Sequence, residues 1–217
     1  MIVRLDARHL SFAYCEGAAV TPVIRDVTLS VGAGEFVGLV GPSGSGKSSL
    51  LFLLAGLRWP DAGDVCLDGR PWPRALDARA DLRRRRLGLI LQEPFLLGHL
   101  SVRENAAAHA VGAEAGARIG PLAEVLGIGR QLDRFPHQLA TGERQRASVL
   151  RALVNAPSVV LADEPTSHLD HATGRQVIEL MVRCAREASL LVATHDAGML
   201  AAAHRVLRIA DGTVVEE

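Results

Sequence analysis

Residues 41 to 48 combine glycines, a lysine and hydroxyl side chains at a spacing that suits phosphate chemistry. They read Gly-Pro-Ser-Gly-Ser-Gly-Lys-Ser and fit G-x-x-x-x-G-K-[ST], in which backbone N–H groups surround phosphate oxygens. Lys47 is the single lysine among the 24 basic residues. Arginine suits flat bidentate contacts, whereas lysine is a compact point charge on a flexible stem. A lysine kept at this position in an arginine-using chain therefore predicts a phosphate-binding loop.

Carboxylates and a histidine follow two apolar runs further along the chain. Residues 158–162 end at Asp163 and Glu164, and residues 190–194 end at His195. A third apolar run, 36–40, leads directly into the phosphate-binding loop. Such runs are typical of buried parallel strands, whose carboxyl ends bind ligands in open α/β sheets. We therefore expect these groups to meet at one sheet edge.

Phosphoryl transfer to water requires neutralised phosphates, a held metal ion and an oriented water. Lys47 and the loop backbone would hold the phosphates, and Ser48 and Asp163 would hold Mg²⁺. Adjacent side chains on a strand point in different directions. Glu164 is therefore free to act on a water while Asp163 serves the metal.

Length, charge and composition bound the remaining possibilities. The chain has 217 residues, a formal net charge of zero and 4% aromatic residues, which predicts one domain with a core of leucine, valine and alanine. Cys15, Cys66 and Cys184 are scattered and odd in number, which argues against a disulfide framework. No run approaches the ~18–20 apolar residues of a membrane span, so any membrane function needs a partner.

The spacing of apolar residues predicts a division into sheet and helical parts. Residues 3–7 and 27–31 alternate as half-buried strands do, and residues 47–57 follow a helical pattern. Residues 76–153 are rich in arginine, alanine and leucine and predict a mostly helical insertion, with turn-like breaks at 112–120 and 127–129. The end of the chain, 205–215, predicts a hairpin turning at Asp211-Gly212.

Five further segments, together with the phosphate-binding loop and Asp163, resemble the ATP-binding subunits of ABC transporters in the expected order. Their residues are Tyr14 in 11–14, Gln92 in 87–93, the signature-like 139–146 (Leu-Ala-Thr-Gly-Glu-Arg-Gln-Arg), the loop 167–170, and His195 in 193–196. The resemblance runs from about Leu5 to Val214. Segments 136–139, 142–146, 152–155 and 161–166 are most similar to the lipoprotein-releasing and macrolide-exporter type.

The resemblance implies an α/β fold: a P-loop NTPase core with a mostly parallel sheet, an N-terminal antiparallel β subdomain and an inserted helical subdomain. One ABC-type ATPase domain would span 1–217, with 1–75 and 154–217 forming the core and β subdomain and 76–153 the helical insertion with the signature. Implied catalytic residues are Glu164, His195 and Gln92, and Gln92 joins Ser48 and Asp163 at the metal. Implied ATP-binding residues are Tyr14, Gly41, Pro42, Ser43, Gly44, Ser45, Gly46, Lys47, Ser48, Ser49, Ala140, Thr141, Gly142 and Glu143.

The function that this resemblance implies is ATP hydrolysis with Mg²⁺ by two ATP-sandwiched chains, coupled to integral membrane permease subunits at the cytoplasmic face of the inner membrane. An alternative is an ATP-gated regulatory subunit of the cell-division type, with weak hydrolysis and no transport. Neither the transported substrate, its direction nor the choice between homodimer and heterodimer follows from the sequence.

The chain departs from the family pattern Leu-Ser-Gly-Gly-Gln/Glu at the signature. Ala140 and Thr141 stand where the family has serine and glycine, and this face binds the ATP held by the opposite subunit in the family. Losing a hydrogen bond to a charged group costs about 1.5–3 kcal/mol. Either a heterodimer with one degraded site or a slow homodimer would explain the change. His168 is a further departure, in the loop 167–170.

The arginine run 83–86 raises the question of nucleic acid. The neutral net charge argues against such a partner, because binders of the phosphate backbone are usually basic. Asp77 and Asp81 lie at helical spacing and are expected to pair with these arginines. We therefore expect a solvated helix face and no nucleic-acid partner.

Overall fold

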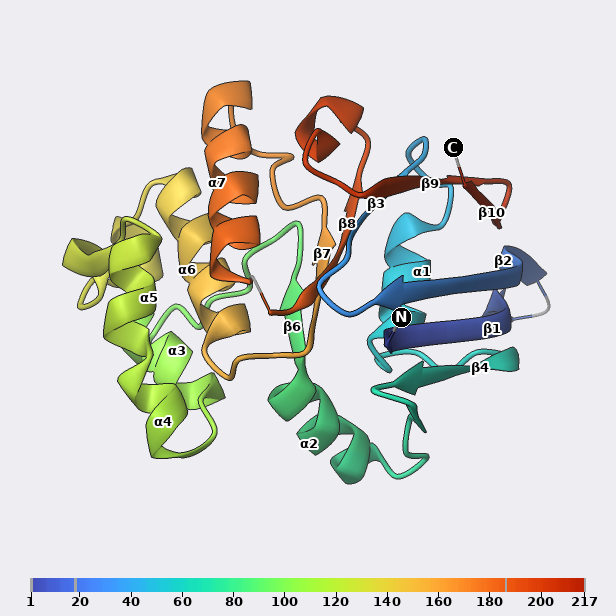
Figure 1. The fold of residues 1–217 in the computed structure, drawn as a ribbon, viewed down its shortest axis with the longest axis horizontal. Coiled ribbons are helices and arrows are strands. Elements are labelled where there is room, and N and C mark those ends of the chain that lie inside the picture. Colours follow the sequence, from blue (N-terminus) through green and yellow to red (C-terminus); the bar gives the residue numbers. More distant parts are fainter. Residues whose placement is uncertain (1, 18, 186, 217) are drawn as a thin grey trace.

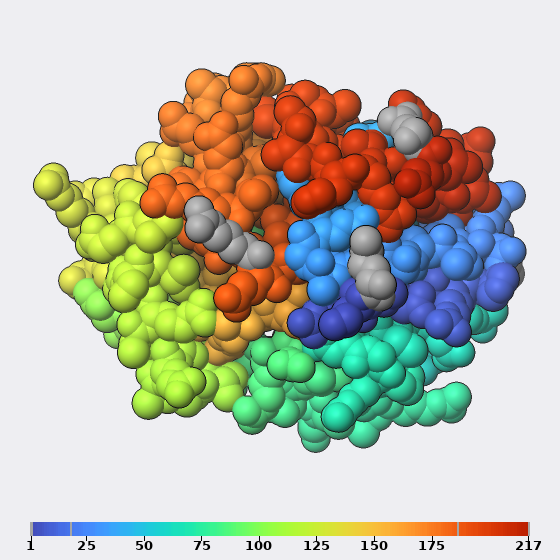
Figure 2. All heavy atoms as spheres, in the orientation of Figure 1, coloured from blue at the N-terminus to red at the C-terminus, as the bar shows by residue number. Residues whose placement is uncertain are grey.

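The computed structural model describes residues 2–17, 19–185 and 187–216. The structure contains an antiparallel sheet, a mixed sheet and a set of helices that lie mainly between residues 100 and 185 (Figure 1). The space-filling view shows the yellow-green residues of this helical part on the left and the blue residues of the first part of the chain on the right (Figure 2).

The larger sheet has six strands in the order β10-β9-β3-β8-β7-β6. Its members are β3 (Phe36–Val40), β6 (Leu87–Ile90), β7 (Val159–Asp163), β8 (Ser189–Thr194), β9 (Arg205–Ala210) and β10 (Thr213–Glu216). All neighbours pair in parallel except β9 and β10. The residues of β3, β7 and β8 are buried throughout, which explains their unbroken apolar sequences.

The smaller sheet has the antiparallel order β2-β1-β4-β5. It comprises β1 (Val3–Glu16), β2 (Ala19–Gly32), β4 (Ala62–Leu67) and β5 (Arg70–Pro71). The alternating segments 3–7 and 27–31 are therefore parts of longer strands. Asp211 and Gly212 both take positive φ in the turn between β9 and β10, which confirms the predicted hairpin.

Seven α-helices occur in the described residues. They are α1 (Lys47–Leu54), α2 (Leu76–Arg86), α3 (Val102–His109), α4 (Gly112–Ala117), α5 (Ile119–Val125), α6 (Thr141–Leu153) and α7 (His171–Cys184). Short 3₁₀ turns lie at Gly129–Gln131, Pro136–Gln138 and Ala197–Leu200. In the part of the chain that the structure places, no helix is long and apolar enough to cross a membrane.

Two details of the expected insertion 76–153 differ in the structure. Strand β6 lies inside this range and pairs with β7, so the segment contributes to the main sheet before it becomes helical. The expected break at 112–120 is wrong, because α4 and α5 occupy most of it. Alanines between the glycines favour a helix, and burial of Ala115 and Ile119 stabilises it against the neighbouring helices.

Each of the four arginines in the run 83–86 has a contact within the chain. Arg85 pairs with Asp81 at 2.9 Å, as the helical spacing predicts, and Arg84 donates to three carbonyls at the C-terminal end of α3. Arg86 pairs with Asp68 at 3.2 Å, and Arg83 reaches the Gly56 carbonyl at 3.5 Å. These contacts give most of the arginines in the run a role in holding neighbouring segments together. The three cysteines are free, as expected.

Candidate functional site

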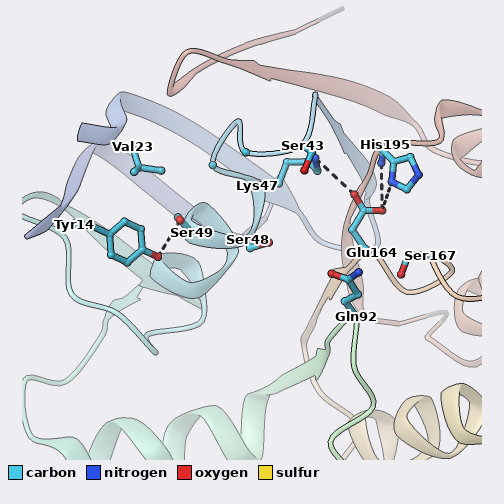
Figure 3. Close-up of a pocket in the computed structure, with 12 residues that line it drawn as sticks. Tyr14, Val23, Ser43, Lys47, Ser48, Ser49, Gln92, Glu164, Ser167 and His195 are labelled. Carbon is cyan, nitrogen blue, oxygen red and sulfur yellow. Dashed lines mark hydrogen bonds and ion pairs between the residues drawn. The ribbon is translucent and has the colours of Figure 1, made fainter. Parts of the chain in front are cut away.

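A cavity of about 510 Å³ opens at the carboxyl edge of the main sheet, beside the loop that precedes α1 (Figure 3). Its walls come from β1, β2, the loop, α1 and the segments after β6, β7 and β8. The residues that line it are Tyr14, Val23, Ser43, Gly44, Gly46, Lys47, Ser48, Ser49, Gln92, Glu164, Ser167 and His195. The fold thus brings together residues separated by up to 181 positions in the sequence, from Tyr14 to His195.

The glycines of the loop are required by its path. Gly46 has φ of 103° at the start of α1, a conformation that side chains rarely adopt. A Cβ on Gly41 would lie 2.4 Å from the Ile209 carbonyl oxygen of β9. These two positions keep the loop close to the sheet, so that its backbone N–H groups and the N-terminus of α1 are available to an anion.

Lys47 is 7% exposed and its ammonium has several oxygen neighbours. The Nζ atom donates to the carbonyls of Gly41 and Pro42 at 2.8 and 3.0 Å, and it lies 3.6 Å from Oε1 of Glu164. A buried ammonium is costly unless it is paired, so these contacts hold the charge in place. Lys47 therefore joins the loop to the carboxylates at the end of β7.

Glu164 is the centre of the polar contacts in Figure 3. Its Oε2 atom lies 2.9 Å from Nδ1 of His195 and also accepts from the backbone N–H of His195 at 3.3 Å. Its own N–H donates to the Ala193 carbonyl of β8 at 2.8 Å. The residue has φ of 44°, a strained conformation of the kind that collects at functional sites. The neighbouring strands therefore fix this carboxylate between Lys47 and His195.

Asp163 precedes Glu164 and is 5% exposed. Burial raises the pKa of its carboxyl group, and a hydrogen bond with Ser48 opposes the rise. Its Oδ1 atom is buried with no hydrogen-bond partner. Carboxylate and hydroxyl oxygens are ligands that Mg²⁺ prefers. An unpartnered carboxylate oxygen beside the Ser48 hydroxyl therefore fits the cation that the sequence predicts.

Tyr14 lies at the other end of the cavity, on β1. Its hydroxyl is 3.2 Å from Oγ of Ser49, and the ring of Phe12 meets it edge-on at 5.0 Å. The Arg58 guanidinium lies 5.1 Å from the ring centroid and covers one face. A nucleotide base stacked on Tyr14 would therefore use the other face or displace Arg58.

The signature-like residues lie outside this cavity, at the start of α6. Ala140 precedes the helix and its N–H donates to Glu143 at 2.9 Å. Thr141 accepts from the Arg144 guanidinium at 3.1 Å, which leaves the hydroxyl proton free to donate. Thr141 and Arg144 line a second cavity of about 300 Å³, shared with Gln92 and His168.

The remaining predicted residues lie in the phosphate-binding loop, in the segments after β6 and β7, and in the first turn of α6. Pro42 supplies a carbonyl to Lys47, whereas Oγ of Ser45 is buried without a partner. Gln92 lines both cavities. Gly142 follows Thr141 in the first turn of α6, where an added Cβ would lie 3.2 Å from Thr173. His168 lies 4.0 Å from Glu93, which adds a weak link between the segments after β6 and β7.

Sequence reasoning missed Val23 and Ser167 as lining residues. Val23 belongs to β2, and only the pairing of β2 with β1 places it near Tyr14. Ser167 lies three residues after Glu164, and its buried Oγ has no partner. A hydroxyl so close in sequence to Asp163 and Glu164 was the available signal.

Comparison with known proteins supports the resemblance that the sequence motifs indicate. The family described as ABC transporter matches residues 24–167. The lipoprotein-releasing system ATP-binding protein LolD of Bordetella pertussis is 41% identical over 216 residues, covering 96% of this chain and 94% of that protein. LolD of Xanthomonas oryzae pv. oryzae is 41% identical, covering 99% of this chain and 91% of that protein.

Two solved structures have the same fold. The dimeric structure of MJ0796, a bacterial ABC transporter cassette, has a TM-score of 0.90 and 30% identity, covering 98% of this chain and 97% of that one. A post-hydrolysis state of MJ0796 bound to ADP and phosphate has a TM-score of 0.86 and 29% identity, with the same coverage. These similarities extend over both sheets and the helical part.

Proposed function

Because this chain belongs to the ABC transporter family as an ATP-binding subunit, we propose that it hydrolyses MgATP between two paired subunits and thereby drives a membrane permease. The single observation that carries the proposal is the position of Glu164, which is fixed between Lys47 and His195 beside the unpartnered oxygen of Asp163. The 41% identity with LolD proteins supports a partner permease of the lipoprotein-releasing type, with this chain bound to it at the cytoplasmic face of the inner membrane.

The residues divide the work of hydrolysis by their contacts. The loop backbone and Lys47 hold the phosphates, and Ser48, Gln92 and Asp163 would hold Mg²⁺. When bound, the metal neutralises phosphate charge during transfer. The Glu164 carboxylate orients a water and accepts its proton, because it is held in place by the N–H of His195 and by Ala193. His195 lines the cavity from the neighbouring strand, where its ring can contact the terminal phosphate.

The second cavity would serve the ATP of the opposite subunit. Thr141 presents a hydroxyl that Arg144 orients, in the place where the family has a glycine after its serine. This hydroxyl would partly replace the one that Ala140 lacks. Dimeric relatives of the same fold support pairing of two such subunits. The altered signature also suits a regulatory subunit with weak hydrolysis, which is the second candidate function.

Glu164→Gln tests the assignment of the base. We expect steady-state hydrolysis to fall at least about a hundredfold, because the amide cannot accept the proton, while ATP binding persists. Glu179→Gln is the matched control, since Glu179 is an exposed carboxylate on α7 that does not line the nucleotide cavity. Release of phosphate from radiolabelled ATP measures turnover, and filter retention measures binding. Unchanged hydrolysis in the Glu164 variant would contradict the assignment.

Reconstitution with a permease separates the two candidate functions. A transport subunit hydrolyses ATP faster when it is bound to its permease in a bilayer, whereas a regulatory subunit keeps the same slow rate. Phosphate release from the chain alone and from the reconstituted complex gives the comparison. The Glu164→Gln complex supplies the background rate.

A further inference from the structure

Another cavity, of about 520 Å³, lies at the amino edge of the main sheet, opposite the nucleotide cavity, which is the cavity of about 510 Å³ beside the phosphate-binding loop. Residues directly before three parallel strands line it: Arg86 before β6, Ser158 before β7 and Ala188 before β8. In Figure 1 the C-terminal end of α7 and the starts of β6 and β8 lie together near the centre of the view. Because strands β6, β7 and β8 are parallel, their amino ends cannot reach the nucleotide.

Among the described residues, four arginines line this cavity: Arg4 of β1, Arg86 of α2, Arg118 between α4 and α5, and Arg183 of α7. The part of the lining that the structure describes contains one carboxylate, Glu187. The arginines come from elements far apart in the sequence, so their meeting is a product of the tertiary fold. We call this cavity, with its four arginines, the arginine cavity.

The carboxylates nearby, Asp68 and Glu187, offset only part of the charge of these arginines. Asp68 already receives Arg4 at 3.0 Å, Arg86 at 3.2 Å and the Ser158 hydroxyl at 2.9 Å. Within the described ranges, no side-chain hydrogen bond or ion pair joins the guanidinium of Arg118 or Arg183 to another residue. A guanidinium has five N–H donors in a planar fork. The arginine cavity therefore holds unused donors and net positive charge.

Helix dipoles explain only part of this arrangement. Arg86 and Arg183 are in the last turns of α2 and α7, where cations are favoured. Arg118 lies between the C-terminal end of α4 and the N-terminal end of α5, where opposite partial charges meet. Arg4 lies in a strand. The helix dipoles therefore do not explain the positions of Arg118 and Arg4.

We propose that the arginine cavity binds a phosphate group, independently of the nucleotide site. Planar guanidinium groups bind phosphate oxygens in a bidentate way, and Arg118 and Arg183 offer free donors for such contacts beside Arg4 and Arg86. The group belongs either to a soluble phosphate compound or to an anionic phospholipid. Both sources present negatively charged phosphoryl oxygens to Arg118 and Arg183.

Binding of inorganic pyrophosphate to the full chain tests the proposal. Isothermal titration is performed on the Lys47→Ala chain, in which binding at the phosphate-binding loop is weakened. We expect Arg118→Gln or Arg183→Gln to weaken the remaining binding about tenfold or more, and the double variant more still. Arg175→Gln is the matched control on α7, because Arg175 is exposed and lies outside the arginine cavity.

Vesicle flotation distinguishes the two sources of phosphate. Retention on vesicles of phosphatidylglycerol and phosphatidylcholine, lost in the double variant and absent with phosphatidylcholine alone, assigns the cavity to a lipid headgroup. Pyrophosphate binding that is lost in the double variant, without vesicle retention, assigns it to a soluble compound.

Arg118→Lys and Arg183→Lys keep the charge, so binding that survives in them excludes a general folding defect as the cause. The proposal is overturned if the double variant binds both probes like the unchanged chain, or if Arg175→Gln loses as much.

Discussion

The two edges of the main sheet use positive charge in different ways. At the carboxyl edge one lysine, 7% exposed, has its ammonium within 3.0 Å of two carbonyls and 3.6 Å from Glu164. At the amino edge four arginines line a cavity of almost the same volume. The carboxyl edge also holds Asp163, with an unpartnered oxygen, and Glu164, with a strained backbone. Under our two proposals, the amino edge binds a phosphate group without chemistry, whereas the carboxyl edge adds the fixed carboxylates that hydrolysis needs.

Lys47→Ala should produce the largest contrast between the edges. We expect ATP hydrolysis to fall at least about a hundredfold, because the ammonium that we propose to hold the phosphates is lost. Arg183→Gln should leave the rate of the isolated chain within about twofold, because the arginine cavity does not contact the nucleotide cavity. Phosphate release at saturating MgATP measures both. A strong fall in the hydrolysis rate of the Arg183 variant would show that the amino edge affects the nucleotide cavity, and it would contradict the prediction.

Lys47→Arg separates charge from shape at the carboxyl edge. Between two carbonyls at 2.8 and 3.0 Å, a planar guanidinium cannot replace a compact ammonium without moving the loop. We expect hydrolysis to stay at least about tenfold below the unchanged chain, although the charge is kept. At the open amino edge, Arg183→Lys should weaken pyrophosphate binding by a smaller factor than Lys47→Arg lowers hydrolysis. Titration and phosphate release supply the two measurements, and full activity in Lys47→Arg would show that charge suffices.

Asp68→Asn tests how the amino edge is stabilised. The substitution removes the charge that pairs with Arg4 and Arg86, while asparagine tolerates the φ of 50° at this position. We expect the free energy of unfolding to fall by about 1 kcal/mol, which lowers Tm by about 2–4 °C for a chain of this size. Pyrophosphate should bind more tightly, since a competing acceptor is gone. Urea denaturation and titration check both, and weaker binding would contradict the charge account.

Asp163→Asn gives the smallest expected effect, on the stability of the chain without nucleotide. Burial raises the folded pKa of Asp163 above its ordinary value of 3.8, so its contribution to stability is complete below that pH and is lost as pH rises through the folded pKa. The Asn variant lacks this loss and should be more stable near neutral pH, by about 1 kcal/mol or less. The difference should close as pH falls toward about 4. Urea denaturation across this range measures it, and a gap that widened on acidification would contradict the prediction.

The local sequence was sufficient for the features that depend on short segments. The loop 41–48, the apolar strands that precede Asp163 and His195, and the hairpin at Asp211-Gly212 are all present where the sequence predicts them. Buried parallel strands and positive-φ turns leave strong local patterns, because neighbouring residues share one constraint. The break expected at 112–120 was wrong because α4 and α5 form there, and Ala115, Ile119 and Ala123 are buried against the neighbouring helices.

Only the tertiary structure decided which side chains meet. Arg58 over Tyr14, Val23 in the nucleotide cavity and Thr141 beside Gln92 each depend on pairing between distant elements. The same is true of Asp68, which joins Arg4 to Arg86 across the amino edge. Such contacts leave no periodic signal in the chain, since each residue belongs to a different local pattern. The sequence by itself determined the chemistry of the single lysine, and the packing of distant strands and helices determined where the arginines gather.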